Sequence, residues 1–248
     1  MSNLEASFSI LAQKGVMLYI LKGTVFTLII ALIAVVLGIV IGSVLALCRN
    51  YCTSKTTKIF GIIATVYIEV FRNTPLLLWI FICPELFNRK LFGLTTVETK
   101  LLFKAAVALI LFTSSVIAEI IRGGLNSIAH GQFEAGHAQG FNVVQVMIYI
   151  ILPQAYRNVI PTLLSQVITT IKDSSYLANV ATIELMARTK QLLSAASRYN
   201  GTGNVNVSDV FVLFGIAALI YFIINYTLSC VVRSMQKRRK RPVRVVAE

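Results

Sequence analysis

Apolar residues gather in five runs along this 248-residue chain, each near the roughly 20 residues that a helix needs to cross a bilayer. The clearest run, residues 24–47, contains 24 residues without a charge. The other four cover about residues 59–83, 104–121, 158–181 and 210–232. The pattern predicts an all-α integral membrane protein with five transmembrane helices within a single membrane domain, residues 23–232.

Composition supports this interpretation and excludes a soluble globular protein. The chain is 56% hydrophobic and 13% charged, whereas soluble domains contain about 45–50% apolar and roughly 25% charged residues. Its net charge of +13 comes from 23 Lys and Arg against 10 Asp and Glu, and 7 of the 23 lie in the last 16 residues. A basic segment that follows a membrane span usually marks the cytoplasmic side, so residues 233–248 are expected to form a basic cytoplasmic tail. No nucleic-acid partner is expected.

Flanking charges predict the orientation of the spans. The short loop of residues 48–58 carries Arg49, Lys55 and Lys58 and no acid, so we expect it inside together with the tail. Five spans then place the N-terminus outside and the C-terminus in the cytoplasm of a bacterial plasma (inner) membrane. This orientation puts residues 182–209 outside, and the stretch of residues 200–206 is interpreted as an ordinary external turn.

Residues 1–22 lack a basic region and a small-residue cleavage site, so they do not resemble a secretory signal. We expect an uncleaved segment on the external membrane surface. Its candidate apolar anchors are Phe8, Leu11, Leu18 and Tyr19.

Small residues recur at every fourth position of the first span, at Ala34, Gly38, Gly42 and Ala46. Such a stripe lets another helix backbone approach closely. Packing within the chain is favoured over a dimer seam.

The loop of residues 122–157 between the third and fourth spans has the pattern of a lever. Its first part can form a short helix, and its second part has apolar residues with the 3, 4, 3 spacing of one helical face, from Val143 to Leu152. Pro153 should then break or bend the chain. A short cytoplasmic helix tied to the next span could transmit force from a soluble partner.

A motif in this loop matches a known family pattern. Glu134, Ala135 and Gly136 are followed by Gly140 after three residues and, after nine more, by residues 150–153 with the sequence IILP. This resembles the EAA motif of prokaryotic ABC importer permeases, which reads EAA, three residues, G, nine residues, I-x-L-P. The only departure is glycine at position 136 in place of the second alanine.

Two further segments resemble the permeases of polar amino-acid importers of the histidine, glutamine and glutamate type. They are residues 69–77, EVFRNTPLL, and residues 118–128, AEIIRGGLNSI, the second followed by Gly131 and Gln132. The resemblance covers about residues 23–232. It implies the ABC type I importer permease fold, with five membrane helices per subunit and a short coupling helix around Glu134 that docks in a groove of a cytoplasmic ATPase.

The resemblance also implies the partners. They are a cytoplasmic ABC ATPase dimer, a second permease subunit that is either a copy or a sibling, an external solute-binding protein or domain, and an amino-acid substrate. The expected ATPase-coupling residues are Glu134, Ala135, Gly136, Gly140 and Pro153. The chain itself has no G-x-x-x-x-G-K-[ST] phosphate loop. We therefore expect a transport subunit that is not an enzyme and holds no cofactor, with ATP and Mg bound by the partner ATPase.

Alternatives from other classes are less favoured. His130, Glu134 and His137 are spaced i, i+4 and i+7 and could hold a metal, but neighbouring glycines weaken the helix and no fourth ligand is evident. The four cysteines have no CxxC spacing, so neither a disulfide framework nor a metal cluster is expected. A self-contained secondary transporter or channel, in which intramembrane charges form an ion path, would not need the ordered cytoplasmic helix.

Charges inside the predicted spans are candidates for the substrate pathway or its gate. Each costs roughly 2.5–3.5 kcal/mol on insertion scales unless it is paired or faces water. The favoured interpretation is mutual pairing, within or across helices. In the alternative, Arg72 and Lys172 lie at one depth, about 20 Å from the inner surface at about 1.5 Å per residue, and bind a zwitterionic amino acid together with nearby acids. The complete candidate set is Glu69, Arg72, Thr74, Pro75, Glu119, Lys172, Asp173, Ser174 and Ser175.

Overall fold

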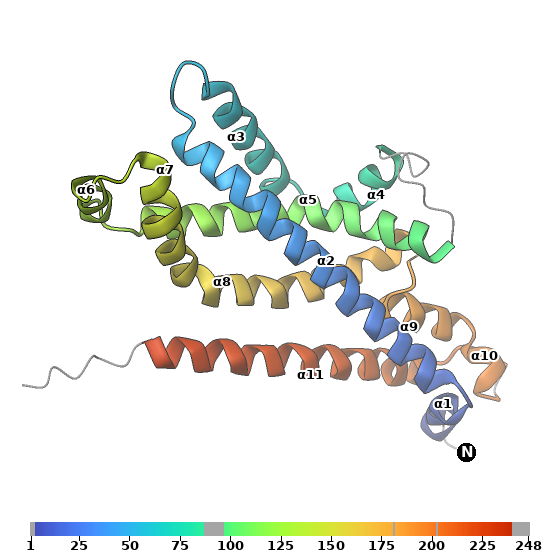
Figure 1. Ribbon diagram of the computed structural model, residues 1–248. Coiled ribbons are helices and arrows are strands. Elements are labelled where there is room, and N and C mark those ends of the chain that lie inside the picture. Colours follow the sequence, from blue (N-terminus) through green and yellow to red (C-terminus); the bar gives the residue numbers. More distant parts are fainter. Residues whose placement is uncertain (1–2, 87–96, 181, 202, 240–248) are drawn as a thin grey trace, which may run out of the picture.

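The computed structural model describes residues 3–86, 97–180, 182–201 and 203–239, and these form a bundle of helices (Figure 1). In chain order the helices are α1 (Asn3–Ala12), α2 (Val16–Tyr51), α3 (Lys58–Arg72), α4 (Leu76–Leu86), α5 (Val97–Asn126), α6 (Gly131–Ala138), α7 (Val143–Gln145), a π-helix (Val146–Ile151), α8 (Leu152–Asp173), a 3₁₀-helix (Ser174–Val180), α9 (Leu185–Ser194), α10 (Ala196–Tyr199) and α11 (Val207–Arg239).

Five membrane crossings can be assigned to these helices. Within the described residues, the segments Val16–Tyr51, Ala106–Asn126, Val143–Val180 and Val207–Lys237 are each long and apolar enough to span a bilayer. The fifth crossing is the pair α3 and α4, which are bent by 108° relative to each other. In Figure 1 the crossings run between two ends of the molecule, with α6 at one end and α1 and α10 at the other. The predicted fold class, an all-α multi-pass membrane protein, is confirmed.

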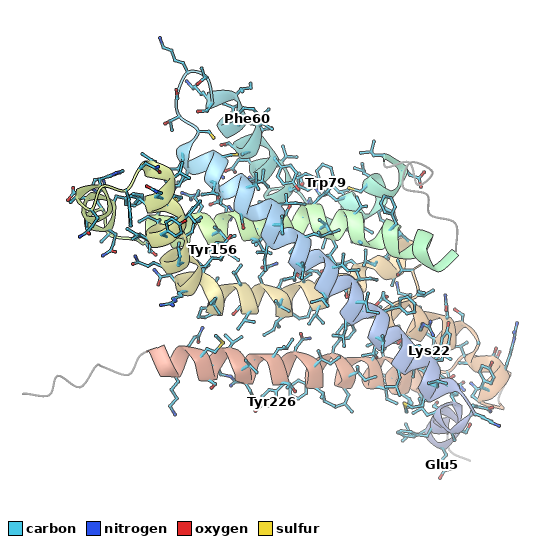
Figure 2. All side chains as sticks on the ribbon, in the orientation of Figure 1. Glu5, Lys22, Phe60, Trp79, Tyr156 and Tyr226 are labelled. Carbon is cyan, nitrogen blue, oxygen red and sulfur yellow. The ribbon has the colours of Figure 1, made fainter. Side chains whose placement is uncertain are left out.

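The span predicted over residues 59–83 is broken at Thr74 and Pro75, where the sequence indicates a bend. Pro75 has no backbone N–H and disfavours helical geometry in the residue before it, so α3 ends at Arg72. The Thr74 hydroxyl donates to the Val70 carbonyl at 2.6 Å and accepts from the Trp79 indole N–H at 2.7 Å. These two bonds stabilise the bend, and Figure 2 shows Trp79 where α3 and α4 meet.

Several helix ends also differ from those predicted. α2 begins at Val16 after Gly15, which adopts a left-handed φ of 94°, so Leu18 and Tyr19 lie in a membrane helix and not in the surface segment. α11 continues to Arg239, and the start of the predicted tail is therefore helical. Residues 182–209 contain α9 and α10, which the sequence analysis missed. The rest of the tail, residues 240–248, and residues 1–2 lie outside the described residues.

The stripe of small residues on α2 packs within the chain, as expected. Ala34 and Ala46 are fully buried. A Cβ added at Gly42 would lie 2.9 Å from the Ser114 carbonyl oxygen and 3.0 Å from the Ala118 backbone nitrogen. Glycine at this position therefore lets the α5 backbone approach α2 closely.

Candidate coupling and transport sites

The predicted short helix around Glu134 is present as α6. In Figure 1 it lies at one end of the molecule, next to α7. Gly140 follows it with a left-handed φ of +83°, and its N–H donates to the His137 carbonyl at 2.9 Å, while the Phe141 N–H donates to the Gly136 carbonyl at 3.2 Å. These two bonds form a Schellman motif. The conformation at position 140 thus explains why the motif has glycine there.

Gly136 has a packing role that explains its departure from the EAA pattern. It is the buried residue of α6. A Cβ at this position would lie 2.8 Å from Cγ2 of Val146 and 2.9 Å from Cδ1 of Ile150. Both contacts belong to the π-helix that leads into α8. The missing methyl group therefore lets α6 lie directly on the start of the fourth crossing.

The opposite side of α6 is open. The Glu134 side chain is 72% exposed, and one carboxylate oxygen lies 3.0 Å from Nδ1 of His130. The ring of His137 pairs instead with the backbone, with Nδ1 3.1 Å from the Phe141 carbonyl oxygen. Among the described residues, no three His, Cys, Asp or Glu side chains are placed to hold a metal ion. An exposed acidic side chain on a protruding helix is instead suited to a protein contact.

Pro153 lies in the first turn of α8, directly after the π-helix. The helical ribbon continues through it, but Figure 1 shows that α7 and α8 point in clearly different directions. A π-helical turn and a proline are both recognised causes of such a kink. The prediction that the chain bends here is confirmed, and the bend separates the part that touches α6 from the part that crosses the membrane.

Charged side chains of the first three crossings form one partly exposed cluster, which we call the arginine–glutamate cluster. It consists of Arg49, Glu69, Arg72, Glu119 and Arg122. Glu119 is at its centre, with carboxylate oxygens 2.8 Å from Arg49, 2.9 Å from Arg122 and 3.5 Å from Arg72. Glu69 pairs with Arg49 at 2.7 Å. The expected pairing of intramembrane charges therefore occurs, and it joins α2, α3 and α5.

Lys172 is not part of the arginine–glutamate cluster. Within a single chain, Lys172 and Arg72 therefore do not form one site. Lys172 lines a cavity of about 340 Å³ between α8, α9 and α11, together with Ser175, Met186, Tyr221 and three apolar residues of α11. Asp173 is the last residue of α8, and the Ser174 hydroxyl that follows donates to the Ile171 carbonyl at 2.7 Å. Lys172 and Ser175 are the members of the predicted set that face this cavity.

Sequence reasoning missed the charged side chains of α9. Glu184 is fully buried at the start of this helix and accepts from the backbone N–H groups of Met186 at 2.8 Å and Ala187 at 2.6 Å. The hydroxyl of Tyr221, a residue that lines the cavity, donates to the Glu184 carboxylate at 3.3 Å. The sequence does contain a signal for this helix. Apolar or small residues recur with helical spacing at Leu185, Thr189, Leu192 and Ala196, directly after Glu184, which can cap a helix N-terminus.

Arg188 fixes α9 against α2. It is 8% exposed and donates to the backbone carbonyls of Ile183 at 2.8 Å and Tyr19 at 3.0 Å. Its guanidinium also lies 4.4 Å from the centre of the Tyr19 ring, a cation–π distance. These contacts hold one wall of the cavity in place.

A bent five-crossing bundle with a protruding helix built on the EAA pattern defines a class of transport protein. Residues 38–241 match the family of binding-protein-dependent transport system inner membrane components, and the chain belongs to this family. Its multi-pass membrane location follows from the same match and from the apolar helices. Membership favours a permease subunit over a self-contained secondary transporter.

Individual relatives give more detail. A probable glutamine ABC transporter permease of Bacillus subtilis (strain 168) is 37% identical over 176 residues, which cover 70% of this chain and 74% of the relative. The arginine transport system permease of the same organism is 31% identical over 225 residues, covering 90% and 93%. The crystal structure of an amino acid ABC transporter with histidines superposes with a TM-score of 0.72 at 28% identity, covering 92% of this chain and 98% of that one.

Proposed function

We propose that this chain is the membrane subunit of an ATP-driven importer that moves polar amino acids into the cell. A dimeric partner ATPase binds the ATP and Mg²⁺, and its closure displaces α6 and drives alternating access. A second permease subunit completes the pore, and an external solute-binding protein or domain delivers the substrate. Family membership and the glutamine and arginine systems named among the relatives support this proposal.

The observation that carries the proposal is the contact between α6 and the fourth crossing. Gly136 leaves no gap between α6 and the π-helix residues Val146 and Ile150, and α8 begins at the next turn, at Leu152. Closely packed elements transmit displacement because their interface has little free volume. A partner that binds Glu134 and Ala135 and displaces α6 would therefore also move α8, whose other end carries Lys172.

The cavity beside Lys172 is our candidate for the substrate pathway. The ammonium group of Lys172 can pair with the α-carboxylate of an amino acid, and the hydroxyls of Ser175 and Tyr221 can supply further hydrogen bonds. Asp173, next in the chain, is a candidate for the α-ammonium group. Glu69, Arg72 and Glu119 belong to the arginine–glutamate cluster. We assign this cluster, together with the bend at Thr74 and Pro75, to the gate of the pathway.

We further propose that the N-terminus is outside and the C-terminus is cytoplasmic. In Figure 1, α6, the C-terminal end of α11 and the connection between α2 and α3 lie at one end of the molecule. That end carries Lys55, Lys58, Arg233 and Lys237. An excess of lysine and arginine in short loops marks the cytoplasmic side, which is where an ATPase must bind.

Charge reversal at Glu134 tests the coupling role. The permease is purified with its natural partner chains and reconstituted into liposomes, and ATP hydrolysis and amino-acid uptake are measured. Removing one partner of an interfacial charge pair costs about 2–5 kcal/mol, so Glu134→Lys should reduce uptake by roughly 30-fold or more or should release the ATPase.

Glu85→Lys is the matched control, because Glu85 is an exposed acid on α4, far from α6 along the chain. It should retain uptake within about twofold. Wild-type hydrolysis and uptake in the Glu134→Lys complex would contradict the proposal. Thermal unfolding of both variants checks that neither change affects the fold, since Glu134 is largely exposed.

A further inference from the structure

A second cavity, distinct from the one beside Lys172, lies where α2 and α3 meet at the end of the molecule that carries α6. It has a volume of about 300 Å³ and is lined by Arg49, the loop residues Cys52 and Thr53, and the outer part of α3 from Lys58 to Val66. A Cβ at Gly61 would lie 2.7 Å from the Cys52 carbonyl oxygen. Glycine therefore lets the loop pack on α3, and the loop residues Cys52 and Thr53 form one end of this cavity.

Charge makes the end of the cavity beside the loop attractive to an anion. Two cations, Arg49 and Lys58, line it, and none of the described lining residues is acidic. Arg49 is held in place by Glu69 and Glu119. With Arg49 included, the arginine–glutamate cluster contains three arginines against two glutamates, so the two carboxylates do not cancel its positive charge. No carboxylate among the described residues lies within ion-pair distance of Lys58.

The rest of the cavity is apolar and opens onto the outer face of α3. Ile62 and Val66 line it and are 49% and 56% exposed. Next to them along the helix, Phe60 and Ile63 are each 57% exposed, and Figure 2 shows Phe60 near the outer end of α3. Exposed apolar patches mark contacts with a membrane or with another protein, and this one is suited to acyl chains. The cavity thus has a cationic end at the membrane boundary and an apolar side within the membrane.

We propose that this cavity binds one anionic phospholipid, with the headgroup phosphate between Lys58 and Arg49 and an acyl chain along Ile62 and Val66. Basic pockets between transmembrane helices are a recognised form of lipid headgroup site, and each lysine or arginine near an anionic surface contributes a factor of about five in affinity. A soluble phosphate would use the cationic end but would gain nothing from the apolar side. Binding of this lipid does not depend on the transport function.

Native mass spectrometry of the purified full-length chain, titrated with phosphatidylglycerol or with phosphatidylcholine, tests the site. The wild type should bind one phosphatidylglycerol more tightly than phosphatidylcholine. Lys58→Gln should weaken phosphatidylglycerol binding about fivefold and leave phosphatidylcholine binding unchanged. Lys58 is at the start of α3 and is exposed, so this change should not disturb folding.

Lys55→Gln is the matched control, because Lys55 is an exposed cation in the same loop that does not line the cavity. It should weaken phosphatidylglycerol binding less than twofold. Equal effects of the two substitutions would overturn the proposal, as would equal affinity for the two lipids. A third arm adds 10-fold excess inorganic phosphate: retained lipid supports a phospholipid site, and displaced lipid would show a simple anion site and refute the assignment.

Discussion

Removing the charge of Glu119 should destabilise the bundle more than removing any exposed carboxylate. The Glu119 side chain is 15% exposed and has three arginine partners, at 2.8, 2.9 and 3.5 Å. Glu119→Gln keeps the shape of the side chain but leaves three guanidinium groups around a neutral amide. Of these, Arg49 retains Glu69 as a partner, whereas Arg72 and Arg122 lose the carboxylate that they share.

The expected magnitude follows from burial. Removing one partner of a buried ion pair costs about 3–5 kcal/mol, and exposed pairs contribute about 0–1 kcal/mol. The partners here are 21%, 33% and 41% exposed, so solvent screening reduces the cost to about 2 kcal/mol. At about 2–4 °C per kcal/mol for a chain of this size, Tm should fall by about 4–8 °C.

The assay is thermal unfolding of the purified chain in one detergent, with wild type and variants measured at the same scan rate. Glu134→Gln is the matched control, since it is the same chemical change at a side chain that is 72% exposed with one histidine partner. Its Tm should stay within about 2 °C of the wild type. If Glu119→Gln lowers Tm no more than Glu134→Gln does, the arginine–glutamate cluster does not hold α2, α3 and α5 together.

Three further predictions use other parts of the structure. Gly42→Ala should lower Tm by several degrees because its Cβ would lie within 3.0 Å of the α5 backbone, whereas Gly123→Ala, with nothing within 4 Å of an added Cβ, should leave Tm unchanged or raise it slightly; equal effects would refute the packing argument. In a cysteine-free background, impermeant thiol reagents applied to intact cells should label Asn204→Cys and not Ser54→Cys, and the reverse pattern would overturn the orientation. Lys172→Met should retain basal ATP hydrolysis in the reconstituted complex but lose at least about tenfold in uptake, and unchanged uptake would remove Lys172 from the pathway.

Local sequence signals were sufficient for the elements whose stability depends on near neighbours in the chain. Hydropathy located the long apolar helices because a bilayer selects length and apolarity directly. The helix around Glu134 and the turn at Gly140 were recognisable for a similar reason, since a left-handed glycine and its two hydrogen bonds involve residues within six positions. Pro75 marked the end of α3 for the same local reason.

Tertiary structure decided the contacts between residues far apart in the chain. Glu69 and Arg72 are spaced for an ion pair on one helix, but Glu69 pairs with Arg49 and Arg72 with Glu119, because helix packing offered each a partner that hydropathy cannot reveal. The glycine at position 136 was only a departure from a motif until the π-helix was seen against it. α9 was missed because its buried face includes polar side chains that are satisfied only by bonds such as Arg188 to the Tyr19 carbonyl. The sequence alone determined which segments cross the membrane, since each segment meets the bilayer individually, whereas the ion pairs and the cavities required knowing which helices are neighbours.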